Sequence, residues 1–177
     1  MINTAAVVGT FVVLAIAGIS AAIQIRHLRA SNQLQILHNM YARIHDPAMH
    51  ESLEFVYYEL PKRIVEDPAY LDGIATGEAR IQHSPLLVAL WNDEIGYAVR
   101  HGLLSEDGIF ELGAGAPAIL RCWKALEPLV DAVRRRTPAA YANFEYLAGR
   151  ARHWIERYPN GKYPVQRAAP EPVRAEI

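Results

Sequence analysis

The amino-acid sequence predicts an all-α protein, in which a single N-terminal transmembrane helix is followed by a bundle of four or five helices. One stretch near the N-terminus is apolar over a length that matches a bilayer. The residues after it carry apolar side chains at helical spacing, and proline repeatedly follows a residue that can cap a helix. No segment alternates polar and apolar residues for long enough to indicate a strand.

The apolar stretch runs from Ala5 to Ile23, has no charged residue, and contains Thr10 and Ser20 as its only polar side chains. As a helix it is about 28 Å long, close to the ~30 Å hydrocarbon core of a membrane. A cleaved signal peptide is one alternative, but residues 1–4 lack the basic segment that such a peptide begins with. A buried helix of a soluble protein is the other, although such helices usually keep a polar stripe. We therefore predict a transmembrane anchor over residues 1–25.

The charges after the anchor are unevenly distributed, although the net charge is only −1. Residues 26–45 hold three arginines and no acid, residues 46–120 hold 13 acids and 4 bases, and residues 121–177 hold 11 bases and 6 acids. One interpretation is that the basic and acidic faces pair with each other or are simply solvated. The other is that the basic ends contact anionic lipid headgroups or an acidic partner.

Orientation follows from the arginines directly after the apolar stretch, Arg26 and Arg29. Positive residues beside a span stay on the cytoplasmic side. The sequence therefore predicts a single-pass protein of the plasma (inner) membrane, with its N-terminus outside and its C-terminal domain in the cytoplasm. Cys122, the only cysteine, agrees with a reducing compartment and excludes a disulfide within the chain.

The remaining chain divides into a juxtamembrane helix at 26–45, a helical bundle at 46–158 and a disordered tail at 159–177 that contains four prolines. The juxtamembrane helix has an apolar stripe at Leu34, Leu37, Tyr41 and Ile44. Within the bundle, long helices are expected at 47–60, 85–101, 117–136 and 138–157, with short ones near 68–75 and from 105. Their starts are indicated by Asp46-Pro47, Asp67-Pro68, Ser84-Pro85, Ser105 and Thr137-Pro138.

Pro61 and the short connection at Thr137 lead to further expectations about these helices. Pro61 lacks an N–H group, so we expect it to end or break the helix that starts at residue 47. Thr137 leaves only one residue between the last two expected helices. These helices should therefore form a tight antiparallel hairpin.

The order of short motifs over about residues 5–157 resembles an uncharacterised bacterial family, described only as a domain of unknown function. The motifs are Arg26-x-x-Arg29-x-Ser31-Asn32-Gln33-Leu34, Phe55-Val56-x-x-Glu59-Leu60, Glu94-Ile95-Gly96-x-x-Val99-x-x-Gly102-Leu103, Trp123-x-x-Leu126-x-Pro128 and Asn143-Phe144-Glu145-Tyr146-Leu147. The resemblance implies one membrane span and a helical cytoplasmic domain. It implies no activity.

Several groupings of reactive residues are weak candidates for chemistry. His50-Glu51-x-x-Glu54 lacks the second histidine of a helical zinc motif, so a solvent-exposed face is favoured over a metal site. Gly113-Ala114-Gly115 can bind an anion through free N–H groups, but a turn between helices is the simpler interpretation. Cys122 lies beside an apolar stripe, which favours a buried thiol over a nucleophile. Trp91, Trp123 and Trp154 are expected in the core. We expect no catalytic residue, cofactor or metal.

The arginine run Arg134, Arg135 and Arg136 closes a predicted helix, where positive charge offsets the helix dipole. Together with Arg26 and Arg29, it is also a candidate contact for lipid headgroups or a partner protein. Three arginines without interleaved aromatic residues, next to an acidic region, make nucleic-acid binding unfavourable.

The favoured function is therefore a membrane-tethered protein-interaction or scaffold module at the cytoplasmic face, of unknown activity. Gly18-x-x-x-Ala22 and Ala17-x-x-x-Ala21 would let two anchors pack closely, and the stripe from Leu34 to Ile44 would extend that homo-oligomer contact into water. The partner is then a second copy or an unknown protein. The alternative is an enzyme at the membrane surface, with Glu51, Glu54, Asp93 and Glu94 in an acidic cleft.

Overall fold

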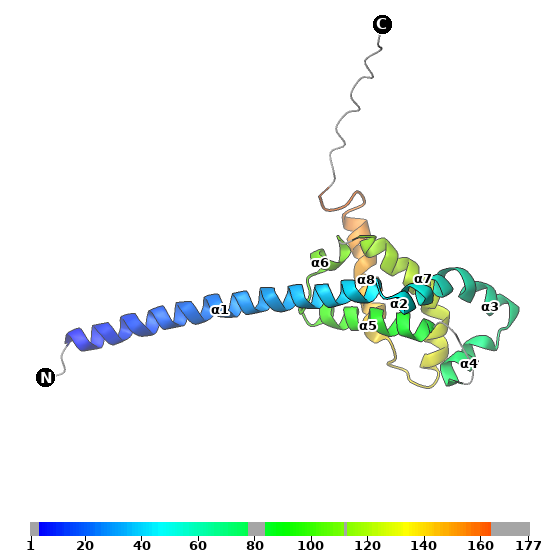
Figure 1. The fold of residues 1–177 in the computed structure, drawn as a ribbon, viewed down its shortest axis with the longest axis horizontal. Coiled ribbons are helices and arrows are strands. Elements are labelled where there is room, and N and C mark those ends of the chain that lie inside the picture. The colour runs from blue at the N-terminus through cyan, green and yellow to red at the C-terminus, as the bar shows by residue number, and fades with distance from the viewer. Residues whose placement is uncertain (1–3, 78–83, 112, 164–177) are drawn as a thin grey trace, which may run out of the picture.

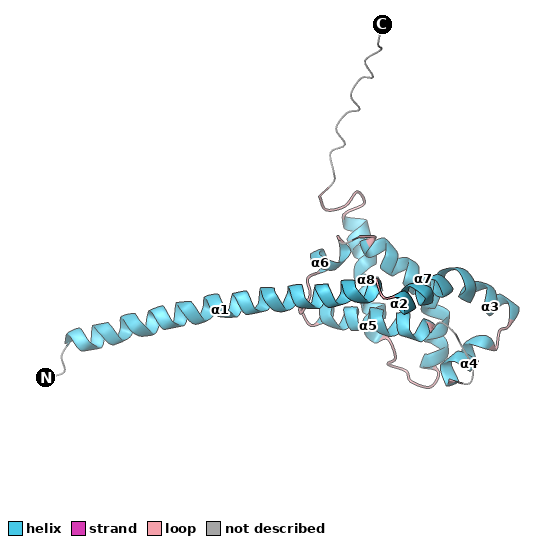
Figure 2. Ribbon diagram, viewed as in Figure 1, coloured by secondary structure: helices cyan, strands magenta, loops and turns pink. Residues whose placement is uncertain are grey.

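The computed structural model describes residues 4–77, 84–111 and 113–163, and they form an all-α fold, as the sequence predicts (Figures 1 and 2). No strand occurs in these ranges. The helices are α1 (Thr4–Ile44), α2 (Pro47–Glu54), the π-helix η1 (Phe55–Glu59), α3 (Leu60–Glu66), α4 (Tyr70–Thr76), α5 (Pro85–Arg100), α6 (Glu106–Phe110), α7 (Gly115–Arg134) and α8 (Ala142–Arg157). The N-terminal part of α1 projects away from the rest of the protein (Figure 1).

Helix α1 is the one helix among the described residues that is long and apolar enough to cross a membrane. None of its most apolar stretch is buried inside the protein, which argues against the alternative of a core helix. The helix continues without a break from the predicted anchor into the predicted juxtamembrane segment. Its last turns pack on the domain through Ile36, Leu37 and Met40, and Arg43 pairs with Glu94 at 2.8 Å. The apolar segment is therefore directly joined to the domain.

Several of the predicted capping residues start helices. Asp46 accepts a hydrogen bond from the Ala48 N–H at 2.8 Å, Ser84 from Leu87 at 3.3 Å, and Ser105 from Gly108 at 3.1 Å. Proline occupies the first turn after Asp46 and after Ser84. Asp67 accepts from Ala69 and starts the turn that leads into α4. These local signals work because cap and helix are adjacent in the chain.

Pro61 breaks the regular α-helix, as expected, but does not end it, because the helical backbone continues past the proline to Glu66. Between α2 and α3 the backbone widens into η1, where the Leu60 N–H donates to the Phe55 carbonyl, five residues back. Pro61 has no N–H to donate, and its ring would collide with the Tyr57 carbonyl in a regular α-helix. The wider π turn accommodates the proline and keeps the helix going.

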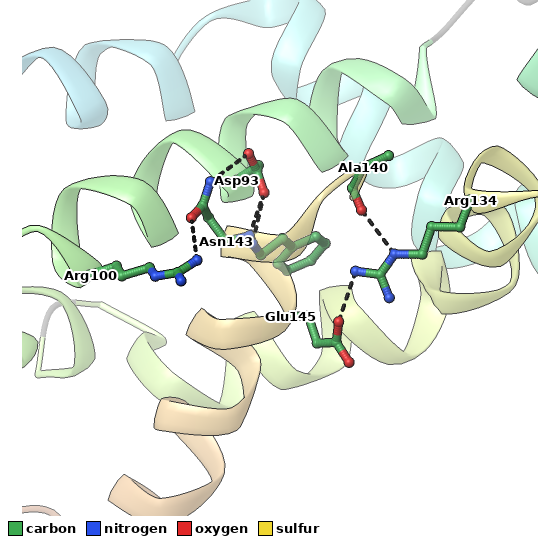
Figure 3. A network of polar contacts seen from close by, with 7 residues as sticks. Asp93, Arg100, Arg134, Ala140, Asn143 and Glu145 are labelled. Atoms are coloured by element: carbon green, nitrogen blue, oxygen red, sulfur yellow. Dashed lines mark hydrogen bonds and ion pairs between the residues drawn. The ribbon is translucent and has the colours of Figure 1, made fainter. Parts of the chain in front are cut away.

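The prediction that α8 begins at Thr137-Pro138 is wrong. Residues 135–141 form turns, and α8 begins at Ala142 after Tyr141, whose φ of 56° is left-handed. The cap comes from another helix, because Asp93 of α5 accepts hydrogen bonds from the backbone N–H groups of Asn143 and Phe144, both at 2.9 Å (Figure 3). The most extensive helix pairing is accordingly that of α8 with α5, while α8 also packs on α7.

The core lies among α5, α7 and α8, with η1 and α4 packed against α7. Leu126, Leu129 and Val130 of α7 and Phe144 and Leu147 of α8 are completely shielded from water. Trp123 is buried as expected, with its ring edge-to-face on Phe144 at a centroid distance of 5.0 Å. Past α8, Lys162 pairs with Asp107; the rest of the predicted tail, residues 164–177, lies outside the described residues.

Candidate functional site

An apolar pocket with a volume of about 320 Å³ lies where α1 meets the domain. Its walls come from α1, from α2 with η1, from α5, and from the segment that comprises α6, the following loop and α7. The lining residues are Leu37, Met40, Tyr41, Ile44, Leu53, Tyr57, Trp91, Asn92, Ile95, Ile109, Gly113, Ala114, Gly115, Ala118, Ile119 and Cys122. No charged side chain is among them. Pockets of this size and polarity are where small ligands bind in proteins.

Helix α1 supplies one wall of this pocket through the stripe that the sequence suggested for association. Leu37, Tyr41 and Ile44 face the domain of their own chain. Leu34 lies on an exposed part of the helix and leaves 67% of its surface accessible. The stripe is therefore divided between an intramolecular pocket and an exposed surface.

A small polar cluster lies where η1, α5 and α7 line the pocket. The Asn92 side-chain amide, which is buried, donates to the Val88 carbonyl at 2.9 Å and lies 3.5 Å from the Cys122 sulfur. Cys122 is also hydrogen-bonded to Tyr57. Burial raises the pKa of the Cys122 thiol to about 12. The pKa of the Tyr57 hydroxyl is raised mainly by its burial and, to a smaller extent, by the neighbouring Cys122 thiol. Both groups therefore stay protonated and neutral at physiological pH.

Trp91 also lines the pocket, although its indole N–H is shielded from solvent. Its side chain is 9% exposed, and its indole Nε1 has no hydrogen-bond partner among the described residues. Buried donors are almost always paired, so an unpaired indole N–H beside a pocket calls for an explanation. The prediction that Trp91 belongs to the core is confirmed, but the residue also lines the cavity.

The local fold explains how these side chains come together. Tyr57 lies within η1, so the backbone geometry imposed by Pro61 sets its direction. Gly113, Ala114 and Gly115, which the sequence suggested as a turn or an anion site, form part of the apolar rim. Gly115 has a φ of 48°, and a Cβ there would collide with the Phe110 carbonyl, so glycine is required for this close approach.

The four acids of the alternative enzymatic hypothesis lie in different settings. Glu51 and Glu54 line a shallow depression on α2 and η1, where Glu54 is 3.5 Å from His50 and both side chains are exposed. Asp93 is engaged as the cap of α8. Glu94 pairs with Arg43 of α1.

Two of the arginines in the run at the end of α7 have partners within the protein. Arg134 donates to the Ala140 carbonyl at 2.9 Å and pairs with Glu145 at 2.8 Å (Figure 3). Arg135 pairs with Asp72 of α4, which lies at the end of the domain away from the apolar part of α1 (Figure 1). Arg136 is exposed, as are Arg26 and Arg29 on α1 directly after the apolar segment.

Sequence reasoning missed the pocket, and the role of Tyr57 and Asn92 with it. One signal was present, because Asn92 is a polar residue next to the apolar stripe of Leu87, Trp91 and Ile95. A second was Pro61, four residues after Tyr57, which predicts a disturbed helix at that point. Neither signal indicates which helices meet there.

The fold is that of a helical domain joined to a helix that is long and apolar enough to cross a membrane. The model of a family described as "Domain of unknown function (DUF4760)" matches residues 11–154, and the chain belongs to this family. This confirms the resemblance to a domain of unknown function that the sequence motifs indicate. Comparison with curated proteins and with solved structures gave no match.

Proposed function

We propose that this protein is a membrane-tethered interaction module, whose α1 crosses the plasma (inner) membrane and holds the helical domain at the cytoplasmic face. The observation that carries the proposal is the continuity of α1, which joins an apolar, unburied segment directly to the domain. A tether of this kind keeps the domain close to other membrane proteins. Arg26 and Arg29 then lie at the headgroups, where each contributes about 1 kcal/mol with anionic lipid.

Association takes place through the exposed face of α1, with a second copy of the chain as the first candidate partner. Under this proposal Leu28 lies between Arg26 and Arg29 at the membrane surface, and Leu34 lies on the part of α1 that enters water; they expose 63% and 67% of their surface. Exposed leucines on a helix next to a membrane gain by packing on a second helix. Glycine and alanine within the anchor, at Gly18 and Ala22, permit close approach of two such helices.

Photo-crosslinking tests this association in native membranes. A photoreactive residue at Leu34, in the full chain, should give a product of twice the monomer mass, and Leu28→Glu should reduce its yield several-fold. The matched control has the same residue at Lys124, which is exposed on α7 and should give little product. Equal yields at positions 34 and 124, or a yield that Leu28→Glu leaves unchanged, would rule out association through α1. A product of another mass that depends on Leu28 would identify a different protein as the partner.

The orientation has its own test, because it follows from the arginines rather than from the fold. Reporters fused after Arg157 should give green fluorescence, which requires the cytoplasm, and no alkaline phosphatase activity, which requires the outside. Exchanging Arg26 and Arg29 for glutamine should weaken this asymmetry. Phosphatase activity without fluorescence in the unaltered chain would reverse the assigned orientation.

A further inference from the structure

We propose that the pocket between α1, η1, α5 and α7 binds a small uncharged molecule, mostly apolar and about the size of two fused aromatic rings, that carries one hydrogen-bonding group. This inference goes beyond the interaction module, because it assigns a ligand site to the domain itself. Its volume of about 320 Å³ falls in the range of small-molecule pockets.

The lining of the pocket determines the class of ligand. No charged side chain lines it, and its titratable groups, Tyr57, Tyr41 and Cys122, are neutral when protonated. A charged ligand would therefore lose its hydration without a compensating partner, which costs far more than apolar contact returns. An uncharged molecule avoids this cost and gains from contact with residues such as Leu37, Ile95 and Ile119.

Polar groups of η1 and α5 account for the single hydrogen-bonding group of the ligand. Asn92 and Tyr57 already bond within the protein, and both have further hydrogen-bonding capacity. A ligand hydroxyl or carbonyl therefore has these two side chains as partners. The Trp91 Nε1 donor, which has no partner among the described residues, is itself shielded from solvent and so lies out of reach of a molecule in the cavity.

The pocket lies too far from the apolar segment of α1 for its ligand to be the tail of a lipid in the bilayer. Along α1, Leu37 lies about 21 Å beyond Ile23, the end of the apolar segment, at the rise of an α-helix. An acyl chain anchored in the membrane does not extend that far into water. The ligand is therefore a molecule that reaches the pocket from solution, and α1 forms a wall of its site.

The test uses the full chain in lipid nanodiscs, with 2-naphthol as the neutral probe and 2-naphthoate as its charged analogue. Cys122 is the only thiol and lines the pocket, but it is buried and protonated, so N-ethylmaleimide labels it only when the pocket opens. A bound molecule slows this opening, and the labelling rate therefore reports on occupancy. We expect 2-naphthol, at the same free concentration as 2-naphthoate, to slow labelling at least fivefold and to raise the midpoint of thermal unfolding. Empty nanodiscs correct for uptake of the probe by lipid.

Matched variants show whether the effect arises in the pocket. Ala118→Leu, which places extra volume in the pocket, should lower the affinity for 2-naphthol at least tenfold, whereas Ala42→Leu on the exposed face of α1 should leave it unchanged. Tyr57→Phe removes one of the two polar groups that line the pocket and should weaken binding about threefold to tenfold. Circular dichroism confirms that each variant is folded.

Several outcomes would overturn the assignment. They are equal protection by 2-naphthoate, no protection by 2-naphthol in the unaltered chain, and binding that Ala118→Leu leaves unchanged. Crosslinking at Leu34 is independent of all these results, so failure of the ligand site is distinguishable from failure of the interaction module.

Discussion

Gly96→Ala should destabilise the domain by about 3 kcal/mol, at the upper end of the range for overpacked cores. A Cβ at position 96 of α5 would overlap the carbonyl group of Asn143 in the first turn of α8. The neighbour is backbone, so it cannot rotate away as a flexible side chain can. The two helices would have to separate where they pack most extensively, and the Asp93 cap of α8 would be strained with them.

The matched control is Gly149→Ala in α8, where a Cβ meets no heavy atom within 4 Å. Alanine is favoured over glycine within a helix by about 0.5–1 kcal/mol, so this variant should be as stable as the original or more so. Urea unfolding of both variants, followed by circular dichroism, measures the difference. If Gly96→Ala were as stable as Gly149→Ala, the close approach of α5 and α8 would be wrong.

Local signals explain why most helices could be predicted from the sequence. Asp46, Ser84 and Ser105 act on N–H groups only two or three residues away, so residue type and spacing contain the whole interaction. The apolar stretch of α1 is equally local. The start of α8 is different, because its cap is Asp93, 50 residues earlier in the chain. Thr137-Pro138 has the local pattern of a start, but the packing of α8 on α5 places the first turn at Ala142.

The candidate pocket could not be predicted for the same reason. Its walls come from four separate segments, and periodicity within one helix shows which residues are apolar but not which helix they meet. Leu37, Tyr41 and Ile44 illustrate this, since their spacing equally suits contact with a second chain and contact with the protein's own domain. Asn92, Tyr57 and Cys122 are far apart in sequence, and only the tertiary fold brings them together.

Trp123→Ala should have the largest effect, a loss of about 3–5 kcal/mol in the free energy of unfolding. The indole is 8% exposed and packs edge-to-face on Phe144, so its removal leaves a cavity between α7 and α8 and deletes an aromatic pair. Domains of this size are stable by only about 5–15 kcal/mol, so the variant should unfold at a much lower urea concentration.

Trp154→Ala provides the comparison for this cavity effect. Trp154 packs at a tilted angle against Phe110 and Tyr158 near the end of α8. It is only partly buried, so water can fill the space that its removal creates. We therefore expect it to cost clearly less than Trp123→Ala in the same unfolding experiment. A loss below about 1 kcal/mol for Trp123→Ala would place its indole at the surface and contradict the packing of α7 on α8. A large loss of stability for Trp123→Ala and a small loss for Trp154→Ala would locate the stabilising aromatic contact at the Trp123–Phe144 pair. This pair belongs to the core next to Cys122, which lines the pocket.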